Sequence, residues 1–179
     1  MWTVLAAFII TFFGACNTGR QTANRTDGDT ILLYKKDTVL STSTVPSVLT
    51  CQFSANSQAQ YDSRRTTLLL LDNPAVTTLP DGVYEVYISF QPPGNKKLSS
   101  SQPDFVNVLD LYSLTAPGAK KWLTVDISEH IKKLFLLKQP LPSMYIIVQF
   151  GGLTLPDGSS TTQAGKLGIT GFRIVQTKN

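Results

Sequence analysis

Residues 83–90, VYEVYISF, consist mainly of β-branched and aromatic residues, a composition typical of a β-strand. Residues 92–95, PPGN, follow this run and are expected to end the strand. Residues 79–82, LPDG, precede it and predict a turn, because proline presets φ and glycine accepts a positive φ. The other strands of the chain can be identified by the same pattern, an apolar run between two turn signals.

Similar short apolar runs, separated by Gly, Pro, Asn and Ser, recur on both sides of this strand. One of them, TTLLLL at residues 66–71, is typical of a strand buried on both faces. The expected strands lie at residues 31–34, 48–53, 66–71, 83–90, 105–111, 122–127, 145–150 and 166–175. Eight or nine strands at this spacing predict an all-β fold, an antiparallel β-sandwich or jelly roll over residues 31–179.

One short helix is expected within this fold. Asp126 and Glu129 have the spacing of a capping box. Apolar residues then recur at helical spacing, at Ile127, Ile131, Leu134 and Phe135. Pro140 ends the segment. We expect this amphipathic helix to cover one end of the sandwich.

Composition excludes several classes of function. The 179 residues are 42% hydrophobic and 16% charged, a length and balance that suit one domain with a packed core. The net charge of +4 is too small to indicate nucleic-acid binding. His130 is the only histidine, and Cys16 and Cys51 are the only cysteines. These counts exclude multi-histidine copper or zinc sites and zinc ribbons, so we expect no cofactor and no metal site.

Residues 1–15, MWTVLAAFIITFFGA, carry no charged side chain and are too short to span a bilayer as a helix. They match the apolar part of a secretory signal peptide. The sequence Phe13-Gly14-Ala15-Cys16 resembles the lipobox of bacterial lipoproteins, and this resemblance implies that Cys16 is acylated and becomes the new N-terminus. An uncleaved buried helix and a signal without lipid are the alternatives.

Residues 16–30 are expected to form a flexible linker, because residues 17–29 include no apolar residue larger than alanine. Thirteen such residues span up to about 45 Å when extended. The lipid and the linker together predict a protein anchored to a membrane of the bacterial cell envelope. Its folded domain would lie in the periplasm or outside the cell.

The reactive side chains of the sequence, a cysteine and a histidine, are each explained by a structural role. Cys51 shares a strand face with Leu49 and Phe53, so we expect a buried core residue. His130 is interpreted as a partly exposed helix residue, because no nucleophile motif accompanies it; a catalytic role with Asp126 is the alternative. The glycine pairs lack the strand–loop–helix setting of a phosphate site. No aspartate spacing argues for calcium.

Five basic doublets stand out: Lys35-Lys36, Arg64-Arg65, Lys96-Lys97, Lys120-Lys121 and Lys132-Lys133. We expect them at strand ends or in loops, where they protect sheet edges from aggregation. Adhesion to an anionic surface is the alternative. Tyr84, Tyr87 and Phe90 do not share one face of their strand, so we expect core residues plus one surface tyrosine rather than a sugar-stacking platform.

The order of several motifs over about residues 67–175 resembles the C-terminal β-domain, or KFDV domain, of the tyrosinase and polyphenol oxidase family. The matching segments are residues 83–88 (VYEVYI), 105–108 (FVNV), 123–127 (LTVDI) with the helix to 137, 145–152, and 167–174 (LGITGFRI). The chain departs from the family pattern at Val83, Glu85 and residues 109–110. In that family the domain packs over a copper domain and shields its active site.

The copper domain of that family needs six histidines, so oxidase activity does not carry over to this chain. The first hypothesis is a non-catalytic, lipid-anchored β-sandwich that binds or shields a protein partner, conceivably a separate copper oxidase. A carbohydrate or surface-ligand-binding module of the cell envelope is the alternative. An enzyme with a carboxylate-only site is a third hypothesis, for which the sequence identifies no residues.

Overall fold

A computed structural model of the chain describes residues 30–42, 44–94, 98–111, 114, 122–137 and 140–178. The proposed signal peptide, Cys16, and all of the proposed linker except Thr30 lie outside the described residues. Two of the basic doublets, Lys96-Lys97 and Lys120-Lys121, also lie outside them.

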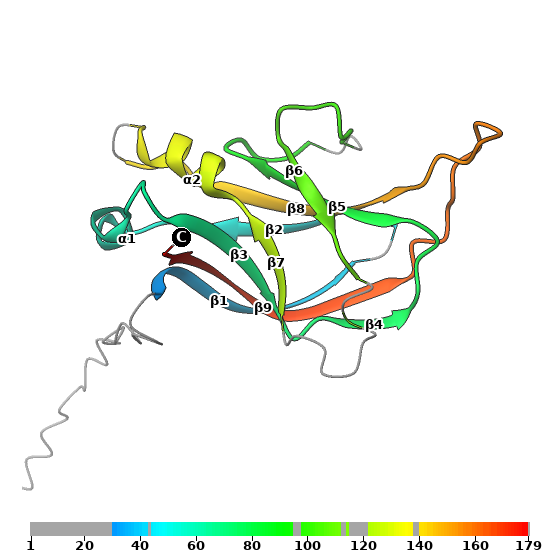
Figure 1. The fold of residues 1–179 in the computed structure, drawn as a ribbon, viewed down its shortest axis with the longest axis horizontal. Coiled ribbons are helices and arrows are strands. Elements are labelled where there is room, and N and C mark those ends of the chain that lie inside the picture. The colour runs from blue at the N-terminus through cyan, green and yellow to red at the C-terminus, as the bar shows by residue number, and fades with distance from the viewer. Residues whose placement is uncertain are drawn as a thin grey trace, which may run out of the picture.

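The described chain forms two antiparallel sheets packed face to face (Figure 1). Sheet A contains β1 (Thr30–Thr42), β9 (Lys166–Thr177), β3 (Thr66–Asp72) and β7 (Trp122–Asp126) in that order, with β4 (Ala75–Thr78) also paired to β9. Sheet B contains β2 (Ser47–Cys51), β8 (Met144–Gly152), β5 (Val83–Ser89) and β6 (Phe105–Leu109) in that order. The predicted all-β antiparallel sandwich is confirmed.

The strand pairs are nested. With β4 set aside, the first strand pairs with the last, β1 with β9, and the second with the second-last, β2 with β8. The series continues inward with β3 and β7, and then β5 and β6. This is the arrangement of a long hairpin rolled into two sheets, which is a jelly roll.

The core lies between the sheets and is formed by alternate residues of each strand. Leu69, Leu71 and Phe172 of sheet A pack toward Val86 and Ile146 of sheet B, and all five are buried. Tyr84 crosses this layer, and its hydroxyl donates to the backbone carbonyl of Ala164 at 2.6 Å.

The expectation that residues 66–71 are buried on both faces is wrong. In β3 buried residues alternate with half-buried ones, and Leu68 and Leu70 are half-buried on the outer face of sheet A. A block of four leucines hides this period of two, because leucine occupies both inward and outward positions.

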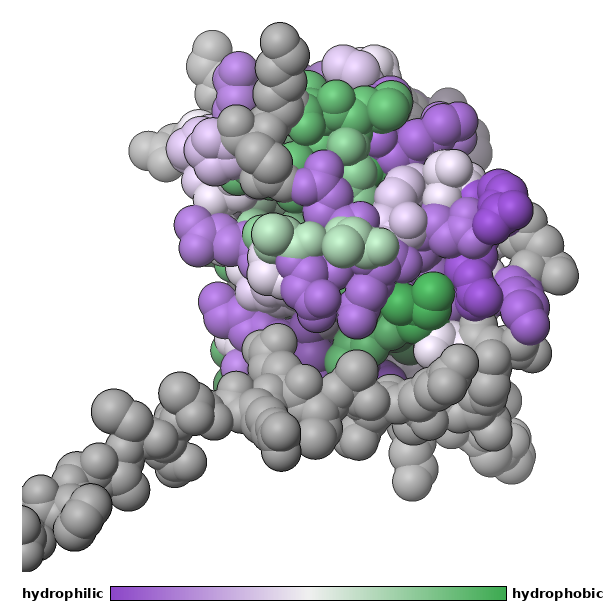
Figure 2. Space-filling view, turned by 90° about the vertical axis from the view of Figure 1, so that its left-hand side faces the viewer, coloured by the Kyte–Doolittle hydropathy of each residue, from purple (hydrophilic) through white to green (hydrophobic). Residues whose placement is uncertain are grey.

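The predicted helix is α2 (Ser128–Phe135), and it covers one end of the sandwich as expected (Figure 1). Ile131 and Leu134 are buried, and the ring of Phe135 contacts those of Phe53 and Tyr61 with centroids 5.2 and 4.8 Å away. Apolar and polar patches alternate on the surface at this end (Figure 2).

The predicted capping box is not formed. The N-cap residue is Ile127, which makes no side-chain cap bond. Asp126 ends β7, and its Oδ1 accepts hydrogen bonds from the backbone N–H of Ser128 at 2.9 Å and from the Ser128 hydroxyl at 2.7 Å. Continuation of the strand through Asp126 shifts the start of the helix by one residue.

A second short helix, α1 (Ala55–Gln60), was not predicted. The hydroxyl of its N-cap, Ser54, accepts the backbone N–H of Ser57 at 3.1 Å. The helix buries none of its residues, so it has no apolar periodicity by which the sequence could have identified it.

The two sheets differ in what covers their outer faces. On sheet B, Tyr87, Ile147 and Gln149 point outward and are still buried. The side-chain amide of Gln149 makes two 3.0 Å hydrogen bonds with the backbone N–H and carbonyl of Leu98, and the ring of Tyr87 contacts that of Phe105 on β6 with centroids 5.6 Å apart. The centre of the outer face of sheet B is therefore buried, whereas Val48 on β2 and Val108 on β6 remain exposed.

Candidate functional site

The outer face of sheet A carries a cavity of about 750 Å³, within the range of small-molecule sites. Its lining residues come from four strands of sheet A and from the residue that follows β3. They are Thr30, Leu32, Lys35, Asp37, Leu68, Leu70, Asp72, Asn73, Trp122, Thr124, Thr170, Gly171, Arg173, Val175 and Thr177. We call this surface the sheet A groove.

Strand register explains the arrangement of its polar end. Asp72 of β3 lies directly opposite Trp122 of β7 on one side and Gly171 of β9 on the other. Gly171 in turn lies opposite Asp37 of β1. A Cβ atom on Gly171 would lie 3.1 Å from the backbone oxygen of Lys36 and 3.5 Å from Asp37 Oδ1, so glycine allows β1 to approach β9 closely here. Arg173 occupies the next row of β9, opposite Lys35.

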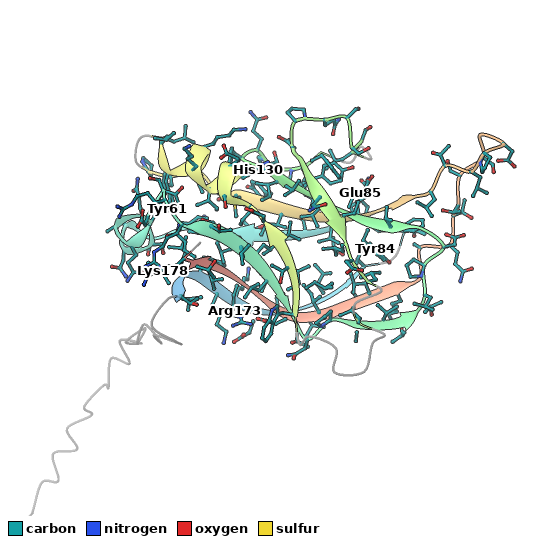
Figure 3. The ribbon with its side chains drawn as sticks, viewed as in Figure 1. Tyr61, Tyr84, Glu85, His130, Arg173 and Lys178 are labelled. Carbon is teal, nitrogen blue, oxygen red and sulfur yellow. The ribbon has the colours of Figure 1, made fainter. Side chains whose placement is uncertain are left out.

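Arg173 and Asp72 form the central ion pair of the groove. Arg173 Nη2 donates to Asp72 Oδ1 at 2.6 Å, and Nε donates to Oδ1 and Oδ2 at 3.0 and 3.1 Å. Both side chains are partly buried, so this pair is less exposed to solvent screening than a fully exposed one. Figure 3 shows Arg173 on the side of sheet A that faces away from sheet B.

Trp122 borders this pair. The guanidinium carbon of Arg173 lies 5.8 Å from the centre of the indole ring, within the range of a cation–π contact. Trp122 nevertheless keeps 40% of its surface exposed. A large aromatic side chain therefore lies beside a fixed charged pair at the edge of an open cavity.

Further polar groups surround this end of the groove. Asn73 Nδ2 donates to Thr170 Oγ1 at 2.9 Å, and Asn73 has a positive φ of 46°. Asparagine tolerates this left-handed conformation better than most residues do. Lys35 Nζ lies 3.5 Å from Asp37 Oδ1.

The other end of the groove is less polar. Leu32, Leu68 and Val175 form one row across three strands, since Val175 is the register partner of both leucines. Thr30 and Thr177, also paired, close this end. The groove thus runs along the strands from an aromatic and charged end to an aliphatic end bordered by hydroxyls.

Cys51 is buried in the core, as predicted. Burial raises the pKa of its thiol to about 12, outweighing the opposite effect of Lys36. The thiol is therefore neutral at physiological pH and is a poor nucleophile.

His130 is half-buried on α2 (Figure 3), which agrees with the expected partly exposed helix residue. Its Nε2 atom is buried and has no hydrogen-bond partner in the described part of the chain. Burial lowers its pKa, and Lys133 lowers it further, while Asp104 and Glu129 act in the opposite direction.

The expectation of one surface tyrosine in β5 is wrong, because Tyr84 and Tyr87 are both fully buried. Tyr87 points away from the core, and its ring contacts that of Phe105 on β6 with centroids 5.6 Å apart. Its hydroxyl donates to Glu85 Oε2 at 2.6 Å, and burial followed by this bond raises its pKa. Glu85 is therefore occupied by an internal partner.

The described basic doublets follow the edge-protection prediction only in part. Lys35 and Lys36 lie within β1, the edge strand of sheet A, rather than at a strand end. Arg64 and Arg65 lie in the turn before β3, and both pair with Asp62. Lys132 and Lys133 lie in the last turn of α2, so for them the expected place at a strand end or in a loop is wrong.

No protein-family model matches the chain, and no curated protein is significantly similar to it. Neither described helix is long and apolar enough to cross a membrane. Among the described side chains, no group of three or more His, Cys, Asp or Glu is placed to hold a metal ion.

The groove residues were not identified from the sequence as a site. Trp122, Asp72 and Arg173 belong to three strands, and no local motif connects them. The sequence does contain one signal for these residues, which is a charged side chain within or directly after an apolar strand. Asp72 follows four leucines, and Arg173 lies within residues 171–175, GFRIV.

Proposed function

We propose that the chain is a non-catalytic, lipid-anchored binding module of the bacterial cell envelope and that its ligand lies in the sheet A groove. The observation that carries this proposal is the Trp122–Arg173–Asp72 arrangement on an open cavity. The centre of the corresponding face of sheet B, at Tyr87, Ile147 and Gln149, is buried, whereas the groove on sheet A is open to a ligand.

Binding rather than chemistry is supported by the state of the reactive side chains. Cys51 is buried as a neutral thiol, and Glu85 accepts a short hydrogen bond from Tyr87. His130 has its Nε2 atom buried and therefore out of reach of a substrate. A general base or nucleophile must be accessible to the proton or atom on which it acts.

The anchor is supported by the lipobox-like sequence that ends at Cys16 and by the polar segment after it. Acyl chains contribute about 0.8 kcal/mol for each buried CH₂, so a multiply acylated cysteine holds a protein stably at a membrane. Cells expressing the full chain are labelled with a clickable palmitate analogue. Label on the native chain and none on Cys16→Ser is expected, and full label on Cys16→Ser would refute the anchor.

The groove is tested in cells by site-specific photo-crosslinking. A photo-reactive residue replaces Thr124 within the groove in one strain. In a control strain it replaces Val108, which is exposed on β6 of the other sheet. Adducts from position 124 and none from position 108 are expected, and their sensitivity to protease or glycosidase identifies the class of ligand. Equal adducts at both positions, or none at 124, would refute the groove as the binding surface.

Partner binding through a second surface is the other candidate function. The segment between β8 and β9 projects from the sandwich (Figure 1), and it exposes 48% of Leu153 and 41% of Leu155. Exposed leucines on a projecting segment are typical of protein contacts. In keeping with the KFDV resemblance, the partner would be a separate copper oxidase. Co-purification of a stoichiometric oxidase that is lost with Leu153→Ser and Leu155→Ser would favour this role.

A further inference from the structure

We propose that the polar end of the sheet A groove binds an uncharged oligosaccharide, with one sugar ring against Trp122 and its hydroxyls on Asp72 and Arg173. This inference rests on the assignment of the groove as the binding surface. It adds the chemical class of the ligand and the residues that select it.

The charges of the groove favour an uncharged ligand. Its lining contains two cations, Lys35 and Arg173, and two carboxylates, Asp37 and Asp72. Lys35 pairs with Asp37, and Arg173 pairs with Asp72. Since the charges balance locally, neither an anion nor a cation gains a large net attraction there.

The central pair still has hydrogen-bonding capacity. The Arg173–Asp72 bonds use Nε and Nη2, so the two N–H groups of Nη1 have no acceptor among the described residues. The carboxylate of Asp72 accepts three hydrogen bonds, and a carboxylate has about four acceptor positions. A sugar hydroxyl both donates and accepts, so neighbouring hydroxyls on one ring complement a guanidinium and a carboxylate held side by side.

The pair is also fixed in advance. Arg173 is held by three bonds to Asp72 and by the Trp122 ring, so little side-chain freedom remains to be lost when a ligand binds. Trp122 supplies a flat, partly exposed apolar surface for the C–H groups of a sugar ring.

The length of the groove indicates several sugar units. Side chains on one face of a strand repeat about every 6.7 Å, and the groove extends over about four rows along β9, so it is roughly 20 Å long. Threonine hydroxyls lie at both ends, from Thr124 and Thr170 to Thr30 and Thr177. An oligosaccharide of a few residues would follow the strands and meet hydroxyls along its path.

The fluorescence of Trp122 provides a direct measurement. The chain has two tryptophans, Trp2 and Trp122, and Trp2 lies within the proposed signal peptide. Emission of the processed full chain in detergent is titrated with cellohexaose, maltohexaose, xylohexaose and chitohexaose, and with hexagalacturonate as the charged probe. We expect a saturable change with at least one neutral hexasaccharide, little affected by salt up to 1 M because no net charge is neutralised.

Calorimetric titrations of variants then assign the site. Trp122→Ala and Arg173→Lys are expected to weaken binding at least tenfold, and Trp122→Phe to retain more affinity than Trp122→Ala because it keeps a ring. Val108→Ala, on the other sheet, is the control and should bind as the native chain does. Thermal melts establish that each variant is folded.

Three results would overturn the inference. The first is that no neutral hexasaccharide binds, and the second is that hexagalacturonate binds more tightly with strong salt dependence. The third is neutral-sugar binding that survives Trp122→Ala and Arg173→Lys. If the sugars fail while position 124 still yields adducts that protease removes, the groove remains a binding surface and its ligand is a protein. If no adducts form at position 124, the proposal that the sheet A groove is the binding surface is itself refuted.

Discussion

The hydroxyl of Tyr84, in sheet B, is hydrogen-bonded at 2.6 Å to the carbonyl of Ala164, which precedes β9 of sheet A. The same oxygen lies 3.2 Å from the carbonyl of Thr42 at the end of β1. Tyr84 therefore connects the two sheets at the point where the ends of two sheet A strands meet (Figure 3).

Tyr84→Phe removes this connection without changing the packing of the ring. The buried carbonyl of Ala164 loses its donor, so we expect the free energy of unfolding to fall by about 1–3 kcal/mol. Urea denaturation at constant m-value measures the change. Tyr145→Phe is the control, because no hydrogen bond holds the Tyr145 hydroxyl in the described structure. Equal effects of the two substitutions would contradict the role given to Tyr84.

Gln149→Leu tests the cover over sheet B. The variant leaves the backbone N–H and carbonyl of Leu98 without their partners, and we expect a loss of about 2–4 kcal/mol in unfolding free energy. Hydrogen exchange at the Leu98 amide should accelerate more than exchange in β8. Leucine at the exposed Gln163 is the control. Unchanged exchange at Leu98 would show that the amide pair does not hold the loop.

Cys51 should be chemically silent in the folded protein. In a Cys16→Ser background it is the sole thiol, and its pKa of about 12 keeps it protonated at pH 8. We expect iodoacetamide to modify it at the rate of global unfolding, with the rate rising on addition of urea. Rapid modification of the native protein would contradict its burial.

The raised pKa of Cys51 also has a consequence for stability. An unfolded thiol ionises near its ordinary pKa of 9.0, whereas the folded one does so near 12. The folded state therefore retains the proton in this interval, and the contribution of Cys51 to stability is present below pH 9 and is lost progressively above it. Cys51→Ala should lack this alkaline component in denaturation measured from pH 8 to 10.

His130 should make the protein sensitive to mild acid. Its pKa lies below the ordinary 6.5 in the folded state, so below about pH 6.5 the unfolded chain takes up a proton more readily than the folded one. We expect His130→Leu to gain stability relative to the native chain as pH falls from 7.5 to 5. His130→Gln, which does not titrate there, should show the same trend. A constant difference at all pH values would contradict burial as the cause.

The sequence predicted the sandwich because each core strand alternates or forms an apolar block between turn signals. It predicted β1 too short, because the polar residues 35–38 separate the apolar run 31–34 from Val39 and Leu40, while the strand continues to Thr42. Residues 35–37 are exposed and are held by pairing with β9, which leaves no hydrophobic pattern, although Leu40 and Thr42 further along the strand are buried. The four-residue β4 was missed for the same reason.

The sheet A groove could not be predicted from local sequence patterns. Asp72 and Arg173 are 101 positions apart, and only the register of β3 with β9 brings them together. Cys51 and His130 were correctly interpreted because their local patterns, a strand face and a helix, were sufficient. Tyr87 was not, because its burial on the outer face of sheet B depends on contacts with residues distant in sequence, such as the ring of Phe105.

Thr30 and Thr177 are register partners, so the start of β1 lies beside the end of β9. If the membrane holds the chain ahead of Thr30 and a ligand holds sheet A, any force between the two passes along β1. A pull parallel to the strand axis shears the hydrogen bonds between β1 and β9 together, instead of peeling them apart in sequence. A tether attached ahead of Thr30 would therefore make the domain resistant to unfolding by the pulling force of a flowing medium.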